Sequence, residues 1–404
     1  MKIAIIGAGA SGCFAAANIP YHPSREVVVF EKTGKPLQKV KISGGGRCNV
    51  THHLLDVPSL VQRYPRGKNL LKKTLHRFSP ADTIVWFESR KVLIKAEADG
   101  RMFPTTNQSQ TIIDCIWLEM QHQQVTVLFH KSVVKIEKVY NQFTLTFQDC
   151  SNYTSDVVLV ACGGFPKLTQ YQWLQDLNHS ISSPAPSLFT FNLPKHSITS
   201  LMGVSVSKAS VKLLNSKIAE QGPVLITHWG LSGPAILRTS AWGAKDIQAK
   251  NYEFSVRINW LGEVTEHELK EHFNDKRKYE GTHFINDRND WELPKRLWEY
   301  LLHEAGIVSK VKWGELKTKQ QQDLIELLIR HHFEVKGKTT YKDEFVTCGG
   351  VELSEINPET MESKKLPGLY FTGEVMNVDG ITGGFNFQHA WSSAWIFAQN
   401  FQST

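Results

Sequence analysis

The chain has 404 residues, of which 41% are hydrophobic and 21% charged, a composition typical of a folded protein of two or three domains with a large core. Lysine and arginine exceed the acidic residues by 46 − 39 = 7, which permits anionic ligands such as phosphates but does not by itself indicate nucleic acid. No apolar run approaches the ~18 residues of a membrane-spanning helix, so we expect no membrane partner.

The six cysteines are scattered without a CxxC pair, so they indicate neither a disulfide framework nor a zinc site. They are Cys13, Cys48, Cys115, Cys150, Cys162 and Cys348. The histidines show no convincing set of metal ligands, and EHFNDK and RHHFE are interpreted as surface helix. We therefore predict reduced thiols, no metal and a cytoplasmic protein.

The first predicted elements are a strand, a glycine-rich turn and a helix. The apolar run KIAII is followed by GAGASG and an alanine-rich stretch that Pro20 ends. A second strand, EVVVF, leads into Glu31, which lies 31 − 12 = 19 residues after Gly12. This spacing is the fingerprint of a dinucleotide-binding βαβ unit, and it argues against a signal peptide over residues 1–17.

Each residue of the fingerprint has a physical role. Gly7 permits the tight turn, Gly9 lets the backbone approach a pyrophosphate, and Gly12 lets helix and strand pack closely. The helix N-terminus offers unpaired N–H groups to the phosphates. Because Glu31 can accept hydrogen bonds from both hydroxyls of a ribose, we expect the adenosine half of the cofactor here.

The next motif, KVKISGGGRCNVTH over Lys39–His52, favours FAD over NAD. A typical NAD domain would continue with βαβ repeats, whereas flavoproteins of the glutathione-reductase type use a polar, glycine-rich segment here to approach the flavin. Lys39 and Arg47 suit contacts with phosphate or flavin carbonyl groups. A flexible surface loop is the alternative. Since no second cysteine lies near Cys48, we expect no redox role for its thiol.

A basic stretch follows and predicts an amphipathic helix with a solvated basic face, with an RNA contact as the functional alternative. Its basic residues are Arg63, Arg66, Lys68, Lys72, Lys73, His76 and Arg77, interleaved with Tyr64 and Phe78 and backed by Leu70, Leu71 and Leu75. Further on, Arg101 in GRMFP is a possible contact for the flavin or the substrate.

Residues 125–160 predict a β-meander followed by a buried strand. VTVLFH, VVKIEKV and FTLTFQD alternate apolar and polar residues, as antiparallel strands do, and Val133 is a plausible backbone partner for adenine. DVVLVACGG is continuously apolar, so we place it in the parallel sheet. A meander inserted before such a strand supports the FAD interpretation.

The βαβ rhythm is absent from Ser182–Pro186, which is interpreted as a crossover, to about Thr340. Short strands predict a barrel or sandwich over about 187–264, and a helical pattern covers about 265–332. We expect a discontinuous FAD-binding domain over 1–186 and 340–404, re-entered at DEFVTCGG, and an inserted substrate domain over 187–339 that lies over the flavin.

The motif THWGLSGPAIL, Thr227–Leu237, lies at the end of the predicted β part. His228 and Trp229 could meet the substrate, and Ser232 is predicted to cap a helix. A purely structural strand-to-helix junction is the alternative.

The stretch LYFTGEVMNVDGITGGFNFQHAWSSAW, from Leu369 to Trp395, predicts a last parallel strand, a second glycine-rich turn and a helix from about Phe385 to Asn400. Asp379 could bind the ribityl or phosphate region, with a plain turn residue as the alternative. Gly383 and Gly384 would bring N–H groups to the ring, and the positive end of the helix would face the flavin edge where negative charge develops on reduction. The two glycine turns would thus serve the two ends of one FAD.

These motifs together resemble the bacterial NAD(P)/FAD-dependent oxidoreductase family that includes aminoacetone oxidase and BaiN-like flavoproteins. The resemblance spans nearly the full length and implies a glutathione-reductase-type Rossmann domain with a β-meander, interrupted by an insert of β-barrel-like and helical parts. It implies FAD at Gly7–Gly12, Glu31, Lys39, Ser43–Asn49 and Asp379–Asn386. The full predicted set is Gly7, Gly9, Ala10, Ser11, Gly12, Glu31, Lys32, Lys39, Ser43, Gly44, Gly45, Arg47, Cys48, Asn49, Val133, Ala161, Gly163, Gly373, Glu374, Asp379, Gly380, Gly383, Gly384, Phe385 and Asn386.

The resemblance does not imply a single reaction, since some members oxidise a small amine and others act in steroid pathways. We predict an FAD-dependent oxidoreductase that moves a hydride to or from flavin N5 of a small organic substrate, as an amine oxidase or an NAD(P)H-linked reductase. No second GxGxxG occurs, so NAD(P)H would dock directly at the flavin. The alternatives are an RNA-modifying flavoprotein and a flavin-binding protein without turnover. The modest charge and the lack of a recognisable tRNA-binding appendage argue against the first, so we expect a small-molecule substrate and no nucleic-acid partner. The sequence identifies no catalytic residue.

Overall fold

The computed structural model describes residues 1–308, 310–339 and 346–402. The chain forms two compact units, one from Met1–Ser187 with Tyr341–Thr404 and the other from Leu188–Thr340. The first residues of the predicted re-entry motif, 343–345, lie outside the described residues. Within the described ranges, no helix combines the length and apolar character needed to cross a bilayer.

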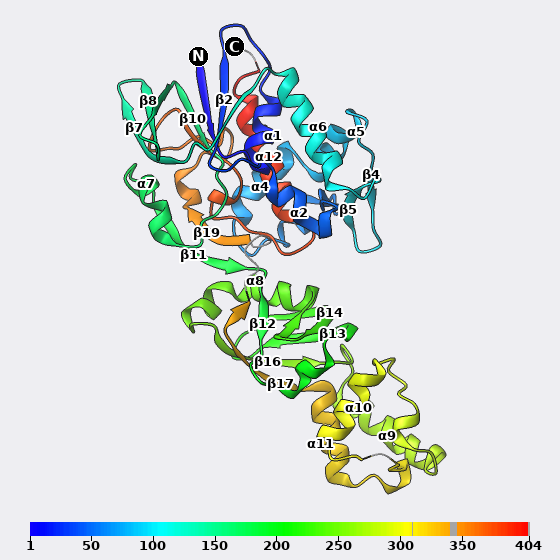
Figure 1. Ribbon diagram of the computed structural model, residues 1–404. Coiled ribbons are helices and arrows are strands. Elements are labelled where there is room, and N and C mark those ends of the chain that lie inside the picture. Colours follow the sequence, from blue (N-terminus) through cyan, green and yellow to red (C-terminus); the bar gives the residue numbers. More distant parts are fainter. Residues whose placement is uncertain (309, 340–345, 403–404) are drawn as a thin grey trace. The chain divides into compact units, whose positions relative to one another are not determined.

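A five-stranded parallel sheet forms the centre of the first unit (Figure 1). Its strands, in spatial order, are β20 (Leu369–Phe371), β10 (Val157–Val160), β1 (Lys2–Ile6), β2 (Glu26–Glu31) and β6 (Thr126–Phe129). Ile3–Ile6 are buried, because helices cover the sheet. Helix α1 (Ala10–Asn18) packs against α12 (Phe385–Gln399) and α6 (Ser109–His122). The predicted parallel strands at both ends of the chain are confirmed.

The meander is a separate three-stranded antiparallel sheet of β7 (Val133–Val139), β8 (Gln142–Phe147) and β9 (Asn152–Ser155). The assignment of VTVLFH to this meander is wrong. That segment forms β6, whose Thr126–Phe129 pair in parallel with Val28–Glu31 at the edge of the main sheet. Exposed and half-buried residues alternate along β6, so its pattern resembles that of a meander strand.

Smaller elements complete the first unit. They are the sheet of β3 (Thr51–His52), β5 (Arg101–Pro104) and β4 (Ile94–Ala96), the pair β11 (Ile181–Ser187) and β19 (Val346–Val351), the helices α2 (Gln38–Gly46), α3 (Val57–Val61), α4 (Lys68–Arg77), α5 (Pro80–Glu88) and α7 (Gln172–Gln175), and the 3₁₀ turns η1 (Leu168–Tyr171), η5 (Leu353–Glu355) and η6 (Gly373–Val375). The predicted crossover at Ser182–Pro186 is a strand, because β11 pairs with β19 before the chain leaves the unit.

An aromatic cluster fixes the helices of the first unit on one another. The ring of Phe14 in α1 lies 4.6 Å from that of Trp86 in α5 and 5.0 Å from that of Trp391 in α12. All three side chains are buried. Their packing joins the N-terminal turn to the C-terminal helix, which are far apart in the sequence.

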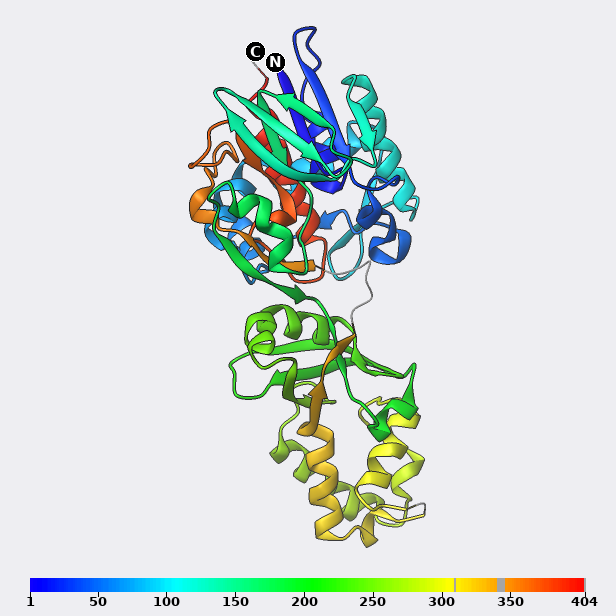
Figure 2. The ribbon, with the colours of Figure 1, turned by 60° about the vertical axis from the view of Figure 1, so that its left-hand side comes forward.

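The second unit contains a seven-stranded antiparallel sheet and a helical part (Figure 2). In spatial order the strands are β17 (His331–Lys336), β16 (Glu253–Asn259), β13 (Ser205–Leu213), β14 (Ala219–Thr227), β15 (Gly230–Ser232), β12 (Thr190–Asn192) and β18 (Lys338–Thr339). The helices are α8 (Pro234–Ala249), α9 (Glu266–Glu280), α10 (Lys295–Glu304) and α11 (Thr318–Ile329), with the 3₁₀ turns η2 (Ser197–Leu201), η3 (Ile285–Asp287) and η4 (Trp313–Glu315).

Two local predictions in this unit are wrong. RHHFE begins strand β17 rather than continuing a helix, and its residues alternate between the buried and the exposed face. Ser232 lies in β15 and does not cap α8; Gly233 is the N-cap, and no side chain caps this helix. A Cβ at Gly233 would lie 2.7 Å from the Pro223 carbonyl oxygen, so close packing explains the glycine.

Candidate functional site

The first glycine turn joins β1 to α1, and packing explains two of its three fingerprint glycines. Gly7 has a φ of +107°, and a Cβ atom there would lie 2.7 Å from the Ala161 carbonyl oxygen. A Cβ on Gly12 would lie 2.0 Å from the Gly7 carbonyl oxygen. Both positions require glycine for the fold itself.

Gly9 differs from its two neighbours in the fingerprint. Its φ is −85°, which any residue adopts, and a Cβ there would meet no atom of the described residues within 4 Å. Gly9 is the N-cap of α1, and no side chain caps the helix. The Ser11 Oγ in the first turn is buried, with no hydrogen-bond partner among the described residues. An open backbone, unpaired donors and an unused hydroxyl fit a bound anion such as a pyrophosphate.

Glu31 ends β2 beside this turn, and its carboxylate is buried. One oxygen accepts a hydrogen bond from the Ala8 N–H at 3.0 Å, and the other accepts from the N–H and Oγ1 of Thr33 at 2.8 and 2.9 Å. A carboxylate has about four acceptor positions, so one remains for a ribose hydroxyl. The Lys131 N–H donates to the Glu31 carbonyl oxygen, which places the chain leading to Val133 beside the same end of the site.

A second group of predicted residues meets around Glu374. Its carboxylate accepts from the Lys39 Nζ at 2.6 Å and from the Thr347 N–H at 2.8 Å. A Cβ on Gly163 would lie 3.7 Å from a Glu374 oxygen. Gly373, at φ +74°, lies so close to α1 that a Cβ would be 2.8 Å from the Ser11 Cβ. The start of the second glycine-rich turn, hereafter the C-terminal turn, is thus held against the first turn.

The glycine-rich segment after Lys39 is partly helical, a structure that the sequence analysis did not anticipate. Helix α2 is interrupted at Ser43, and Gly44, Gly45 and Gly46 follow with φ values of 58°, 68° and 82°. A Cβ on Gly44 would touch the Phe103 ring, but one on Gly45 or Gly46 would meet nothing within 4 Å. These two glycines therefore present open backbone, as Gly9 does.

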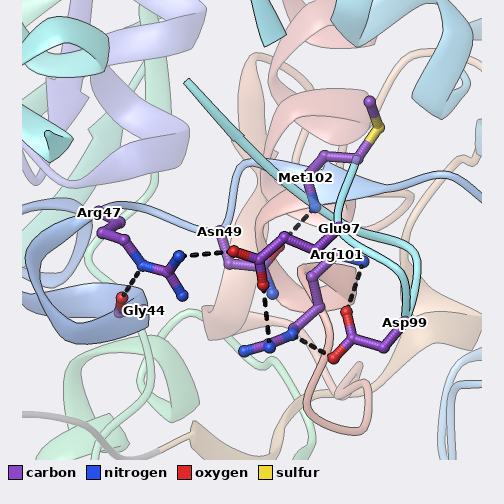
Figure 3. A network of polar contacts seen from close by, with 7 residues as sticks. All are labelled: Gly44, Arg47, Asn49, Glu97, Asp99, Arg101 and Met102. Atoms are coloured by element: carbon purple, nitrogen blue, oxygen red, sulfur yellow. Dashed lines mark hydrogen bonds and ion pairs between the residues drawn. The ribbon is translucent and has the colours of Figure 1, made fainter. Parts of the chain in front are cut away.

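Arg47, Asn49 and Arg101 belong to one network that ties this segment to β5 (Figure 3). Glu97 accepts from Arg47 at 2.6 Å and from Arg101 at 3.1 Å, and the Asn49 Oδ1 accepts from the Met102 N–H at 3.3 Å. The guanidinium of Arg47 also lies 4.0 Å from the centre of the Phe103 ring. Since both arginines have carboxylate partners here, their first role is to shape the segment.

Cys48 does not behave as a reactive thiol. The side chain is buried, and burial raises the pKa of its thiol to about 12, although a hydrogen bond with Ser43 lowers it. All six cysteines are free. A buried thiol with a raised pKa is a poor nucleophile.

The second glycine turn begins α12. Gly384 is the N-cap in the left-handed region, with no side-chain cap, and a Cβ there would lie 2.5 Å from the Thr51 carbonyl oxygen. Asn386 closes the turn, because its Oδ1 accepts from the Gly380 N–H at 2.8 Å and its Nδ2 donates to the Gly380 carbonyl at 2.9 Å. Gly383 has a φ of +140°. The turn is therefore rigid, and it leaves the first N–H groups of α12 without a side-chain partner.

Asp379 in this turn is fully buried and engaged by the protein itself. Both of its oxygens accept from the Arg66 guanidinium, and one also accepts from the Ser187 Oγ at 2.8 Å. Burial disfavours the charge of Arg66, but the hydrogen bonds and charge of Asp379 outweigh it, so the pKa of Arg66 is raised. A direct flavin contact through this carboxylate, as we predicted, is therefore less favoured than a role in holding the turn through Arg66.

The residues just before α4 also hold this turn, through hydrogen bonds. The Arg63 carbonyl accepts from the Ile381 N–H at 3.0 Å, and the Tyr64 hydroxyl donates to the Phe385 carbonyl at 2.7 Å. The Phe385 ring stacks on that of His52, with centres 4.8 Å apart. Arg66 was predicted as part of a solvated helical face, but it precedes the helix and is largely buried.

The family model described as HI0933-like protein Rossmann domain matches residues 1–400 of this chain. The chain belongs to this family. The HI0933-like chain is 32% identical to the ribosomal RNA dihydrouridine synthase of Escherichia coli, over 98% of the chain and 96% of that protein. It is 28% identical to the 3-dehydro-bile acid delta(4,6)-reductase of Clostridium scindens, over 98% of the chain and 97% of that protein.

Solved structures resemble the HI0933-like chain in fold. The 3-ketosteroid-delta4-(5alpha)-dehydrogenase of Rhodococcus jostii matches with a TM-score of 0.51 at 10% identity, covering 98% of this chain and 97% of that one. At this identity the match shows the fold alone. Together with the parallel sheet and the family, it confirms the predicted Rossmann fold class and the resemblance on which the prediction rested.

Other predicted residues of the HI0933-like chain are placed as follows. Lys32 is exposed near the Phe165 ring. In the second unit, His228 is exposed at the turn between β14 and β15, and its ring lies 4.2 Å from that of Trp229. The contacts of Arg66, Tyr64 and Ser187 with the C-terminal turn were missed. The only sequence signal was the basic stretch, which contains Arg66 and Tyr64 but not Ser187. Contacts between residues hundreds of positions apart leave no local sequence pattern.

Proposed function

We propose that the chain is an FAD-dependent oxidoreductase, and more specifically a reductase of carbon–carbon double bonds conjugated to a carbonyl group. The names of both relatives support this chemistry. Dihydrouridine is uridine whose C5–C6 double bond, conjugated to the C4 carbonyl, has been saturated. A delta(4,6)-reductase of a 3-dehydro-bile acid saturates double bonds that are conjugated to a 3-oxo group. Relatives with such different substrates share this one reaction type.

The observation that carries the cofactor assignment is the open backbone at Gly9. No feature of this protein's own packing requires a glycine there, whereas a pyrophosphate against the α1 N-terminus does. The unused Ser11 hydroxyl and the open backbone of Gly45 and Gly46 support the same ligand. Glu31 would hold the adenosine ribose, which distinguishes FAD from FMN.

When bound, FAD would take two electrons from a donor such as NAD(P)H and deliver a hydride to the β-carbon of the substrate, whose α-carbon gains a proton. The chain's own residues would position the cofactor and polarise its ring. Lys39 and Glu374 would orient the middle of the cofactor, and the uncapped N-terminus of α12 at Gly384 would stabilise negative charge at the ring. Because the sequence has no second GxGxxG, the nicotinamide would dock at the flavin itself.

Within this reaction type we favour uridine in ribosomal RNA as the substrate. The dihydrouridine synthase is the more similar of the two relatives, with 32% against 28% identity. A small-molecule enone is the second candidate, supported by the bile acid reductase and by the sequence-based expectation of a small organic substrate. Amine oxidation, also expected from the resemblance, has no support from these two names.

The test is a product analysis with purified holoprotein and NADH or NADPH. One reaction contains an unmodified ribosomal RNA transcript, digested afterwards to nucleosides for mass spectrometry. The other contains a 3-oxo-4-ene steroid, followed by the loss of its conjugated absorbance. We expect dihydrouridine in the first. An enone product alone would move the assignment to the second candidate, and no product in either would refute the proposed reaction.

A further inference from the structure

We infer that the exposed basic face of helix α4 binds the phosphate backbone of RNA beside the flavin end of the site. This rests on the proposed function in that it takes RNA as the substrate. The face consists of Lys72, Lys73 and His76 on the helix together with Arg63 just before it, and all four side chains are exposed. None of these four side chains makes an ion pair or hydrogen bond within the described parts of the chain.

The charge of this segment is one-sided. No aspartate or glutamate occurs between Asp56 and Asp82, while that interval holds six lysines and arginines and one histidine. Two of the six, Arg66 and Arg77, form ion pairs with acids from elsewhere in the chain, Asp379 and Glu359. In the helix, Lys68 and Lys72 are four residues apart, as are Lys73 and Arg77. Like charges at this spacing destabilise a helix by about 0.2–0.5 kcal/mol a pair, and a helix that served only folding would gain from acids here.

The opposite side of α4 shows why the helix nevertheless forms. Leu70, Leu71, Thr74 and Leu75 are buried, and the helix packs against α12. Packing therefore fixes the helix and leaves the basic face turned outward. A row of exposed cations on a helix that is fixed by packing fits a polyanion better than a single small anion.

The position of this face distinguishes it from ordinary surface charge. The residues just before α4 bind the C-terminal glycine turn directly, through the Arg63 carbonyl, the Tyr64 hydroxyl and the Arg66 guanidinium. Gly67, the N-cap of α4, lies so close to that turn that a Cβ would be 2.6 Å from a Val378 methyl. A strand of RNA held on α4 would therefore pass beside the turn proposed to hold the flavin.

The experiment compares the binding of a fluorescein-labelled oligouridylate to three full-length holoproteins by anisotropy, over a series of salt concentrations. They are the wild type, Lys72→Gln with Lys73→Gln, and the control Lys217→Gln with Lys250→Gln. The control removes the same charge from two exposed lysines of the second unit. Neither pair of substitutions touches residues placed in the cofactor site.

We expect the α4 variant to lower the slope of log K against log salt by about 1.4, since each single-strand phosphate contact contributes about 0.7. Affinity at ~0.1 M salt should fall about 20-fold by the same relation, while the control stays within about twofold of the wild type. FAD content should be equal in all three proteins. Equal loss in both variants, or no loss in the α4 variant, would overturn the inference.

The outcome is separable from that of the proposed function. If the wild type forms dihydrouridine while the α4 variant binds oligouridylate normally, the reaction stands and the surface is wrong. If the α4 variant alone loses RNA binding but no protein forms dihydrouridine, the surface stands and the substrate is wrong. A wild type that binds no oligouridylate and reduces only the steroid would refute both the surface and the RNA substrate.

Discussion

Gly9 is the residue at which the requirements of folding and of ligand binding can be distinguished most clearly. Its neighbours Gly7 and Gly12 are required by a positive φ or by contacts as short as 2.0 Å to a hypothetical Cβ. Gly9 is required by neither, so the space beside it is available to a ligand. Substitutions of Gly9 and of Gly12 are therefore expected to have opposite effects on folding.

We expect Gly9→Val to yield a soluble, folded and colourless protein. Valine tolerates the extended backbone at this position, but its side chain would fill the space of the pyrophosphate. Gly12→Val should instead fail to fold, because its Cβ would overlap the Gly7 carbonyl. Circular dichroism and flavin absorbance of the two variants decide this. A yellow Gly9→Val protein with normal FAD content would show that the fingerprint has been misassigned.

The buried ion pair of Arg66 and Asp379 gives a second prediction at this scale. Removing one partner of a buried pair leaves an unpaired charge and typically costs about 3–5 kcal/mol. Asp379→Asn should therefore lower the melting temperature of the protein with and without FAD. The exposed Asp114→Asn variant is the control and should change stability by no more than about 0.5 kcal/mol. Unchanged melting together with weakened FAD affinity would instead support the direct flavin contact.

Among the elements, helix α12 carries a buried titratable group that bears on stability. His389 lies on its buried face, and its Nε2 donates to the Gly373 carbonyl at 3.2 Å, while its Nδ1 has no partner among the described residues. Burial lowers the pKa of His389 from 6.5 to about 4, although the bond with Gly373 and the charge of Glu374 act in the opposite direction. The imidazole is therefore neutral in the folded protein at neutral pH.

This burial predicts a pH dependence of unfolding. Below pH 6.5 the unfolded chain binds a proton at His389 that the folded chain takes up only near pH 4. Stability should therefore fall between pH 6.5 and 4, by about 3 kcal/mol from this group. The measurement is urea unfolding at several pH values for the wild type and His389→Gln, with the exposed His228→Gln as a control. A His389→Gln protein that keeps the full acid dependence would contradict the assignment.

Local elements could be predicted where the pattern along the chain carries the structure. The β1–turn–α1 unit and α12 were predicted to within a residue or two, because glycine spacing and apolar runs define them. The strand β6 was misplaced, since an edge strand and a meander strand share the same alternation. The network of Arg47, Glu97 and Arg101 could not be predicted, because Arg47 and Glu97 lie 50 residues apart in the sequence, with three helices between them.

At the scale of the whole molecule, the chain builds a Rossmann unit from both of its ends and places a second unit between them. The return of the chain supplies β20 and α12, so the second glycine turn comes to lie against the first through Gly373 and Ser11. Sequence could predict that both turns exist. It could not predict that the stretch before α4 holds the C-terminal turn, a contact between residues more than 300 positions apart.

The most direct measurement is the anaerobic oxidation of the reduced holoprotein. The protein should first release FAD, and no FMN, on heating. Reduced with dithionite and mixed with an unmodified ribosomal RNA transcript, its flavin should regain the yellow oxidised absorbance while dihydrouridine forms; a transcript already saturated at its uridines should leave it bleached. A flavin that stays reduced with both the RNA and a 3-oxo-4-ene steroid, or a protein that carries no FAD, would contradict the account.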